Sequence, residues 1–201
     1  MSGSAAKRTP QPAKKSKPVS WETFQKKYLA REDGYKYEWL NGIVEKTPYT
    51  MDKSQLFILR NLLAWFRKLL NEGKVNGELI PEADLFFLKN HRRPDVCWLT
   101  GEQIDRLAEN GYEVPAFVIE IISNNDIMNK VARKMQDYRA AGVQAVWHIL
   151  PALEEIHVYS GEKLEKMVVC TGKKECSAAP ALPGFVLPAE EAFLKGSSEK
   201  K

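Results

Sequence analysis

The chain has 201 residues, of which 44% are hydrophobic, and this is enough for one domain with a hydrophobic core. No apolar run reaches the about 20 residues of a membrane span, and the N-terminal residues lack the apolar segment of a secretory signal. The three cysteines, Cys97, Cys170 and Cys176, form no C-x-x-C pair, which argues against a disulfide framework or a zinc ribbon. We therefore expect a cytoplasmic protein with reduced cysteines and no membrane partner.

Positive charge is concentrated at the N-terminus. Residues 1–18 contain five lysines and arginines and no acid, and removing these five charges from the net charge of +4 leaves −1 for residues 19–201. The proline, serine, alanine and lysine content of residues 1–18 predicts a disordered basic arm. Such an arm can add salt-sensitive affinity for nucleic acid, or it can be a solubilising tail. We place the folded domain at residues 19–201.

The first predicted elements are a helix and a hairpin. The helix runs from Trp21 to about Arg31, with Ser20 as its N-cap. The stretch YKYEWLNGIVEKTP then alternates around Asn41-Gly42, a dipeptide that favours the two positive φ angles of a type I′ turn. We therefore expect two antiparallel strands within residues 35–48.

A long helix is predicted next, from Asp52 to a stop near Gly73. Its leucines and one phenylalanine recur at helical spacing, so one face should pack against a sheet. Residues 75–100 predict two or three short strands, and residues 101–111 predict a brief helix or turn.

The second half of the chain alternates strands and helices. The segment FVIEII (residues 117–122) is short, apolar and β-branched, which is typical of a buried strand. A helix is predicted over residues 125–143. Further predicted elements are strands at AVWHIL and EIHVYS, joined by a turn at Pro151, an edge strand at KLEKMVVC, and a loop-rich C-terminus with a short helix near residues 189–195. This order predicts an α/β fold with a mixed sheet and helices on both faces.

One acidic residue, Glu120, lies inside the predicted buried strand. A lone carboxylate there costs several kcal/mol unless a cation pairs with it. Asp95 follows Pro94 at the start of the preceding strand, and neighbouring strands lie about 4.8 Å apart. If these strands are neighbours, the two carboxylates converge, repel each other and favour a cation between them. Hard oxygen ligands suit Mg²⁺ or Mn²⁺, so Asp95 and Glu120 predict a metal site.

Lys134 adds a cationic group to this pair. It continues the apolar stripe of the predicted helix by helical steps from Ile127 and Val131 to Tyr138, so it lies on or beside the face that packs on the sheet. Carboxylates, a divalent metal and a lysine together are the groups needed for phosphodiester hydrolysis. The metal polarises the phosphate and lowers the pKa of bound water, while the lysine stabilises developing charge. Lys130, one helical turn earlier, is the alternative lysine.

Several segments resemble known nucleases. RRPDV and VIEIIS resemble the P-D and (D/E)-x-x parts of the restriction-endonuclease-like superfamily, called PD-(D/E)XK. More closely, five segments resemble the Uma-two family of bacterial restriction endonucleases: YEWLNGIVE, RPDVCWL, FVIEIISNND, RKMQDYRAAGVQAVWHILP and IHVY. Each segment alone is weak, but five in this order, from about Tyr35 to Tyr159, are specific. The resemblance implies a central mixed β-sheet flanked by helices.

By residue, the resemblance points to Asp95 and Glu120 as metal-binding acids and to Lys134 as a lysine moved from the strand to the next helix. It also suggests Glu38 as an auxiliary acid near the site. Three positions depart from the pattern: Ile122 stands where the superfamily has its lysine, Ser54 where the family often has histidine, and Leu150 where it often has aspartate.

Each of these residues also has a structural interpretation. Asp95 can be a turn residue at the start of a strand, and Glu38 can be an exposed hairpin residue. Glu120 can form a buried ion pair with Lys134 or Arg133. A basic segment before Asp95 can either grip phosphates or be a solvated loop; its members are Lys89, His91, Arg92 and Arg93.

Together these features predict a Mg²⁺- or Mn²⁺-dependent nuclease that hydrolyses DNA. The alternative is a catalytically degenerate nuclease fold that binds nucleic acid or a protein partner, and the nearly neutral folded domain favours this alternative. Cutting both strands of a duplex is most simply done by a dimer, so a homodimer is compatible with the predicted function.

Overall fold

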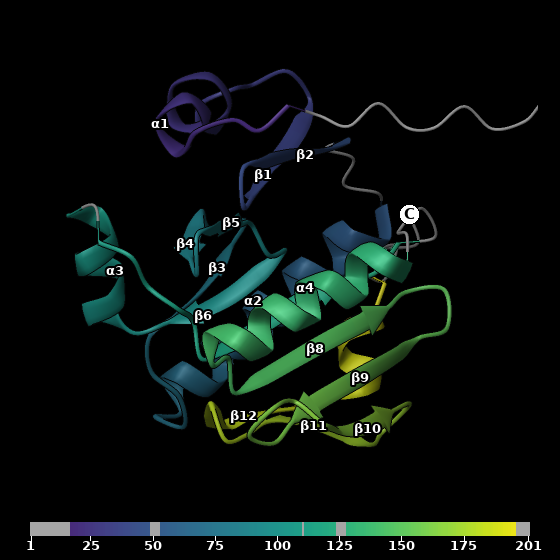
Figure 1. Ribbon diagram of the computed structural model, residues 1–201. Coiled ribbons are helices and arrows are strands. Elements are labelled where there is room, and N and C mark those ends of the chain that lie inside the picture. Colours follow the sequence, from purple (N-terminus) through teal and green to yellow (C-terminus); the bar gives the residue numbers. More distant parts are fainter. Residues whose placement is uncertain (1–16, 49–52, 110, 124–127, 196–201) are drawn as a thin grey trace, which may run out of the picture.

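The computed structural model describes residues 17–48, 53–109, 111–123 and 128–195 (Figure 1). The helices are α1 (Trp21–Phe24), which continues as the π-helix η1 (Gln25–Leu29), α2 (Lys53–Asn71), α3 (Gly101–Ala108), α4 (Met128–Ala141) and α5 (Ala189–Phe193). The strands are β1 (Tyr35–Leu40), β2 (Ile43–Pro48), β3 (Glu78–Pro81), β4 (Leu85–Phe87), β5 (Asn90–Arg92), β6 (Val96–Leu99), β7 (Phe117–Ile121), β8 (Ala145–Leu150), β9 (Glu155–Ser160), β10 (Lys166–Cys170), β11 (Glu175–Ala178) and β12 (Leu182–Pro188).

A six-stranded mixed sheet forms the centre of the molecule, in the order β10-β9-β8-β7-β6-β3. β7 and β8 are parallel, and the other neighbouring strands are antiparallel. Parallel neighbours need a crossover connection, and here the crossover contains α4. The predicted mixed sheet flanked by helices is therefore confirmed.

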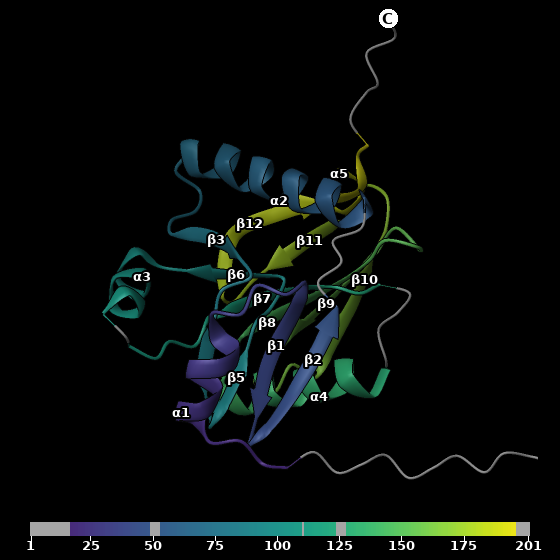
Figure 2. The same cartoon turned by 90° about the horizontal axis from the view of Figure 1, so that it is seen from above.

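The two faces of this sheet carry separate cores because side chains alternate along each strand. On one face, Phe117, Ile119 and Ile121 pack with buried residues of α2 and of the β11–β12 hairpin. On the other face, Val118 packs with Tyr138 of α4. Figure 2 shows α2 and the β11–β12 hairpin on one side of the sheet and α4 on the other.

A smaller antiparallel sheet, in the order β2-β1-β5-β4, packs over α4 (Figure 1). Its outer face holds Tyr37 and Trp39, which join Phe24 of α1 in an aromatic cluster. Asn41 and Gly42 have φ angles of 46° and 93°, as the predicted type I′ turn requires. The inner face of this sheet meets α4 both through ion pairs and through Leu85 and Phe87 of β4, which pack with Tyr138.

Several local predictions are confirmed and others are wrong. Ser20 caps the first helix by accepting a hydrogen bond from the Thr23 N–H. Residues 75–100 form four strands, because the basic segment pairs as β5 between β1 and β4. The C-terminus is less loop-rich than predicted, since β11 and β12 form a hairpin that buries Phe185 and Leu187. The alternation of apolar and polar residues that predicts a strand is not clear in this region, because the two strands are short and contain glycine and prolines.

The N-terminal part of the domain is attached to the small sheet at Val19. The Val19 N–H donates to the Gly42 carbonyl at 2.7 Å, and the indole N–H of Trp39 donates to the Val19 carbonyl at 2.7 Å. Residues 1–16 of the predicted arm, the predicted helix start at Asp52 and residues 125–127 of the helix predicted over 125–143 lie outside the described residues. Within the described part of the chain, none of the helices is both long enough and apolar enough to span a bilayer.

Candidate active site

The register of the central sheet places Asp95 beside Glu120. β6 and β7 are antiparallel with Val96 opposite Ile119; Asp95 lies in the bend directly before β6, and continuing the register by one residue places it across from Glu120. Opposite residues of an antiparallel pair point to the same face of the sheet, which here is the α4 face. The Ile121 N–H donates to Asp95 Oδ2 at 2.7 Å and fixes the carboxylate against the end of β7. The structure thus brings the two predicted metal-binding acids together on one face.

Glu120 is held by two side chains from α4. Lys134 Nζ lies 2.8 Å from Glu120 Oε2, and the Tyr138 hydroxyl donates to Glu120 Oε1 at 2.5 Å. Lys134 and Tyr138 are four residues apart, so they project from the same face of the helix. Because Glu120 is only 4% exposed, burial raises the pKa of its carboxyl, with a further contribution from the charge of Asp95 that Lys134 opposes.

The ammonium group of Lys134 stays charged despite its surroundings. Burial alone would lower the pKa of Lys134, but the negative charges of Glu120, Glu38 and Asp95 raise it well above its usual range. Lys130 occupies a different environment: its side chain is 42% exposed and its Nζ lies 3.9 Å from Glu45 Oε2. Of the two candidate lysines, Lys134 is therefore the one that contacts a predicted site acid.

Glu38 is buried, so its interpretation as an exposed hairpin residue is wrong. It lies on the inner face of the small sheet, where Arg92 Nη1 donates to its Oε2 at 3.1 Å and the Arg93 N–H donates to its Oε1 at 2.9 Å. Lys134 Nζ is 4.0 Å from Glu38 Oε1. Burial opposes the charge of Glu38, but Lys134, Arg92 and Lys36 together lower the pKa of its carboxyl to about 2.

Within the basic segment before Asp95, Lys89 lies in an exposed turn, but His91 and Arg92 are not part of a solvated loop. Arg92 is 1% exposed and bridges the small sheet to α4 by pairing with Glu38 and Asp137. His91 is also buried and lies 2.9 Å from a carboxylate oxygen of Asp84. These side chains are buried because the segment forms β5 in the interior of the small sheet. The guanidinium group of Arg92 is paired with two carboxylates of the protein, so Arg92 has a structural role beside the site.

Lys36 is the site residue that sequence reasoning missed. It is 8% exposed, and its Nζ lies 3.1 Å from Asp95 Oδ1 and 3.4 Å from Glu82 Oε1. Burial by itself would lower the pKa of Lys36, but the charge of Asp95 and of the neighbouring acids raises it. The alternation of YKYEWL could have revealed this residue, since Lys36 and Glu38 share one face of β1 and the aromatic residues share the other.

His148 lies beside Glu120 on the next strand. The two residues are register partners in the parallel β7–β8 pair, so their side chains share the α4 face. Burial, together with the nearby His157 and Lys134, lowers the pKa of His148 to about 4, so its ring is neutral at neutral pH. Its ring packs edge-on against the ring of Tyr159, with the ring centroids 4.9 Å apart.

Comparison with known protein families shows which family the chain belongs to. A family model described as "Uma2: Putative restriction endonuclease" matches residues 21–190, which is most of the chain. The chain belongs to the Uma2 family. This membership confirms the predicted resemblance and supports a nuclease-like function.

A solved structure has the same fold as this Uma2 chain. It is described as a "putative nuclease belonging to DUF820" from Anabaena variabilis, and it aligns with a TM-score of 0.71 and 19% sequence identity. The alignment covers 88% of this chain and 98% of that one. At this identity the likeness shows the shared fold. No curated protein matches the chain.

The acids of this Uma2 chain fit a divalent metal by their chemistry. The described residues contain no cluster of three or more histidine, cysteine, aspartate or glutamate side chains that could hold a metal ion. Mg²⁺, however, keeps several water ligands and is commonly bound by one or two carboxylates. Asp95 and Glu120 supply two hard carboxylates, which is the ligand type that such a site uses.

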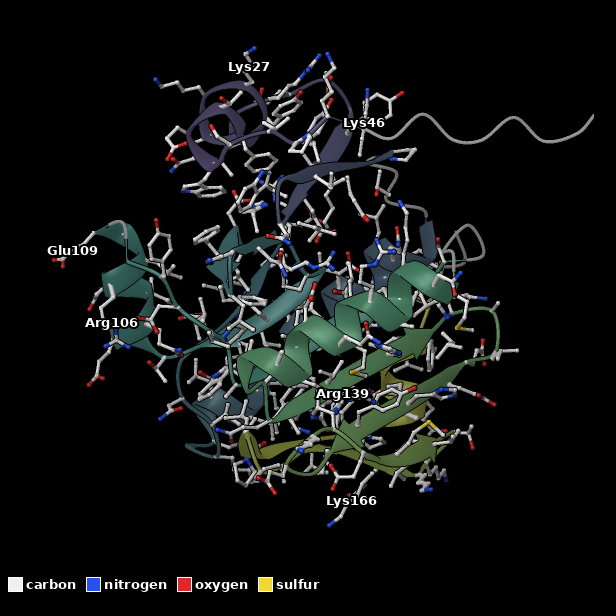
Figure 3. All side chains as sticks on the ribbon, in the orientation of Figure 1. Lys27, Lys46, Arg106, Glu109, Arg139 and Lys166 are labelled. Carbon is white, nitrogen blue, oxygen red and sulfur yellow. The ribbon has the colours of Figure 1, made fainter. Side chains whose placement is uncertain are left out.

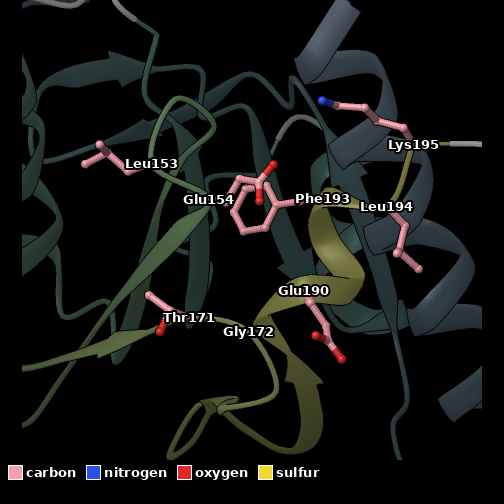
Figure 4. A pocket seen from close by; sticks show the side chains of 8 residues that line it. All are labelled: Leu153, Glu154, Thr171, Gly172, Glu190, Phe193, Leu194 and Lys195. Atoms are coloured by element: carbon pink, nitrogen blue, oxygen red, sulfur yellow. The ribbon is translucent and has the colours of Figure 1, made fainter.

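A pocket of about 480 Å³ lies away from these acids, between the β8–β9 turn and α5 (Figure 4). Its lining consists of Leu153, Glu154, Thr171, Gly172, Glu190, Phe193, Leu194 and Lys195. None of the predicted site residues lines it, so we do not include it in the candidate active site.

The low pKa of Glu38 predicts how stability depends on pH. Since the folded state lowers this pKa from 4.5 to about 2, the ionised carboxylate stabilises the fold above pH 4.5. That contribution, about 3 kcal/mol, is lost as the pH falls from about 4.5 to about 2. We expect Glu38→Gln to be less stable than the wild type at pH 7, with the difference shrinking across this interval. Urea unfolding at a series of pH values measures it, and a constant difference would contradict the assignment.

Proposed function

We propose that this Uma2 chain is a nuclease that hydrolyses DNA phosphodiester bonds with Mg²⁺ or Mn²⁺ bound by Asp95 and Glu120. The observation that supports this most strongly is that Asp95, directly before β6, and Glu120 of the neighbouring strand β7 are close enough to interact electrostatically, with Lys134 in contact with Glu120. Placing the partly exposed Asp95 near the buried Glu120 is unfavourable unless cations accompany the two acids, and such arrangements are frequent at functional sites.

The residues of the chain have distinct proposed roles. When bound, the metal would polarise the scissile phosphate and lower the pKa of a bound water. The Ile121 N–H orients Asp95, and the Tyr138 hydroxyl orients Glu120. Lys134 places its ammonium group next to Glu120, where it can hold a phosphate oxygen and stabilise the charge that develops there.

Glu38 is proposed as an auxiliary acid that acts through Lys134. Its carboxylate lies 4.0 Å from Lys134 Nζ and is itself held by Arg92 and the Arg93 N–H. The small sheet thereby helps to hold the lysine over the acids. This arrangement favours an ordered ammonium position, which reduces the reorganisation needed during the reaction.

The alternative is a catalytically degenerate member of the family that binds nucleic acid or a protein. The ion pairs support it: Lys134 already neutralises Glu120, and Lys36 already neutralises Asp95. Such a protein would keep the acids as structural partners of the lysines. The proposal includes a cytoplasmic location and, for the nuclease, a homodimer; residues 1–18 either add salt-sensitive affinity for DNA or serve as a solubilising tail.

A cleavage assay separates these two functions. Full-length protein is incubated with supercoiled, linear and single-stranded DNA in Mg²⁺, in Mn²⁺ and in a chelator. We expect cleavage in at least one metal and none with the chelator, and we expect the Asp95→Asn variant to be inactive. DNA binding without metal-dependent cleavage, equal in wild type and Asp95→Asn, would favour the degenerate fold and contradict the nuclease proposal.

A further inference from the structure

We infer that Lys36 competes with the divalent cation for Asp95, so that an internal ion pair occupies the metal-binding carboxylate until a cation displaces it. This inference rests on the proposed function, because it requires a cation at Asp95 and Glu120. It concerns a residue outside the predicted site, on the inner face of the small sheet. As a consequence, the ion pair between Lys36 and Asp95 lowers the affinity of the site for the metal.

The contacts of Asp95 identify which partner a cation must displace. Its Oδ2 accepts the Ile121 N–H at 2.7 Å, and its Oδ1 lies 3.1 Å from Lys36 Nζ. The Ile121 N–H belongs to the backbone at the end of a buried strand, so it stays in place. The Lys36 ammonium is on a flexible side chain, and a divalent cation at Asp95 would repel it. Lys36 is therefore the partner that moves.

Lys36 has a second acid to hold it once it leaves Asp95. Glu82 Oε1 lies 3.4 Å from Lys36 Nζ, and the Glu82 side chain is 21% exposed. A lysine ammonium has three N–H donors, so it can exchange one carboxylate for another without leaving the site. Displacement by a cation would therefore leave no buried ammonium without a partner, which lowers the free-energy cost of the exchange.

A merely structural ion pair would give a different pattern. If Lys36 only stabilised the fold, its removal would destabilise the protein and leave the affinity of folded protein for metal unchanged or lower. If Lys36 competes with the metal, its removal strengthens metal binding while weakening the metal-free fold, because Asp95 loses its partner. Metal affinity thus distinguishes competition from a structural role.

The experiment measures Mn²⁺ binding to the full chain by electron paramagnetic resonance. The variants are Lys36→Met, Lys36→Gln, which keeps a hydrogen-bonding side chain, and Lys36→Arg, which keeps the charge. The matched control is Lys46→Gln, which removes the same charge from the opposite face of the same sheet. Lys46 is paired in register with Tyr37 on the outer face, and Figure 3 shows it on the side away from α4.

We expect Lys36→Met and Lys36→Gln to bind Mn²⁺ about tenfold more tightly than the wild type, which corresponds to about 1.4 kcal/mol. Lys36→Arg and Lys46→Gln should stay within about twofold of the wild type, since they keep the competing charge or remove a remote one. The increase in melting temperature on adding Mn²⁺ should be larger in Lys36→Gln than in the wild type, because tighter binding stabilises the folded state more.

Two failures are distinguishable. In the first failure, Asp95→Asn loses the Mn²⁺ binding of the wild type, but folded Lys36→Gln binds Mn²⁺ no more tightly than the wild type does. This result would overturn the competition and leave the proposed function standing. If wild type and Asp95→Asn bind Mn²⁺ alike, the cation is not at Asp95, and both the proposed function and the inference fail. Should Lys36→Met fail to fold without metal, Lys36→Gln and the Mn²⁺ melting series decide the result.

Discussion

Replacing Glu120 with glutamine is expected to reduce metal-dependent DNA cleavage by about a hundredfold or more. Glutamine has nearly the same shape, and its carbonyl oxygen can still accept the hydrogen bond that Tyr138 donates to Glu120. It lacks the charge that a divalent cation needs from its ligand. Lys134 keeps Glu38 as a nearby carboxylate, so we expect the variant to remain folded.

Initial cleavage rates and Mn²⁺ affinity measure this effect. The matched control is Glu113→Gln, which makes the same change at a carboxylate paired with Arg106, outside the candidate active site. We expect the control to cleave like the wild type. Wild-type cleavage by Glu120→Gln, with unaltered dependence on metal, would remove Glu120 from the site.

Replacing Lys134 with alanine is expected to lower cleavage by about a hundredfold while metal binding and the fold are kept. Lys134 Nζ is 2.8 Å from Glu120 and 4.0 Å from Glu38, so its removal takes away the cation that would hold the reacting phosphate. A bound metal still neutralises the acids, and their affinity for it should not fall.

The matched variant is Lys130→Ala, which removes the same charge one turn earlier on α4. The partly exposed Lys130 pairs with Glu45 at 3.9 Å, and we expect nearly wild-type cleavage. Single-turnover rates on the same DNA compare the two. Full activity of Lys134→Ala would overturn its assignment. Loss of activity in Lys130→Ala alone would assign the catalytic role to Lys130 instead.

The sequence predicts the central part of this fold because its signals are local. The apolar run of residues 117–122 marks β7, and Asn41-Gly42 marks the β1–β2 turn. The candidate acids are found in the same way, since Glu120 interrupts a buried strand and Asp95 directly precedes the neighbouring strand β6. The helical spacing of Lys134 and Tyr138 is enough to place both against the sheet.

The remaining features depend on how distant elements pack. Nothing near Lys36 in the sequence shows that the small sheet packs over α4 and brings this lysine to Asp95, 59 residues away. For the same reason the sequence of the basic segment is compatible with a solvated loop, whereas in the structure Arg92 is buried against Glu38 and Asp137. Ion pairs of this kind are set by tertiary contacts, which local periodicity does not encode.

The position of a bound Mn²⁺ ion tests the central claim most directly. Crystals grown or soaked with Mn²⁺ locate the ion by its anomalous scattering. We expect an anomalous peak in contact with the carboxylates of Asp95 and Glu120, with Lys36 Nζ moved away from Asp95 Oδ1. An ion bound elsewhere, or a crystal in high Mn²⁺ in which Asp95 remains paired with Lys36 and Glu120 with Lys134, would contradict the account.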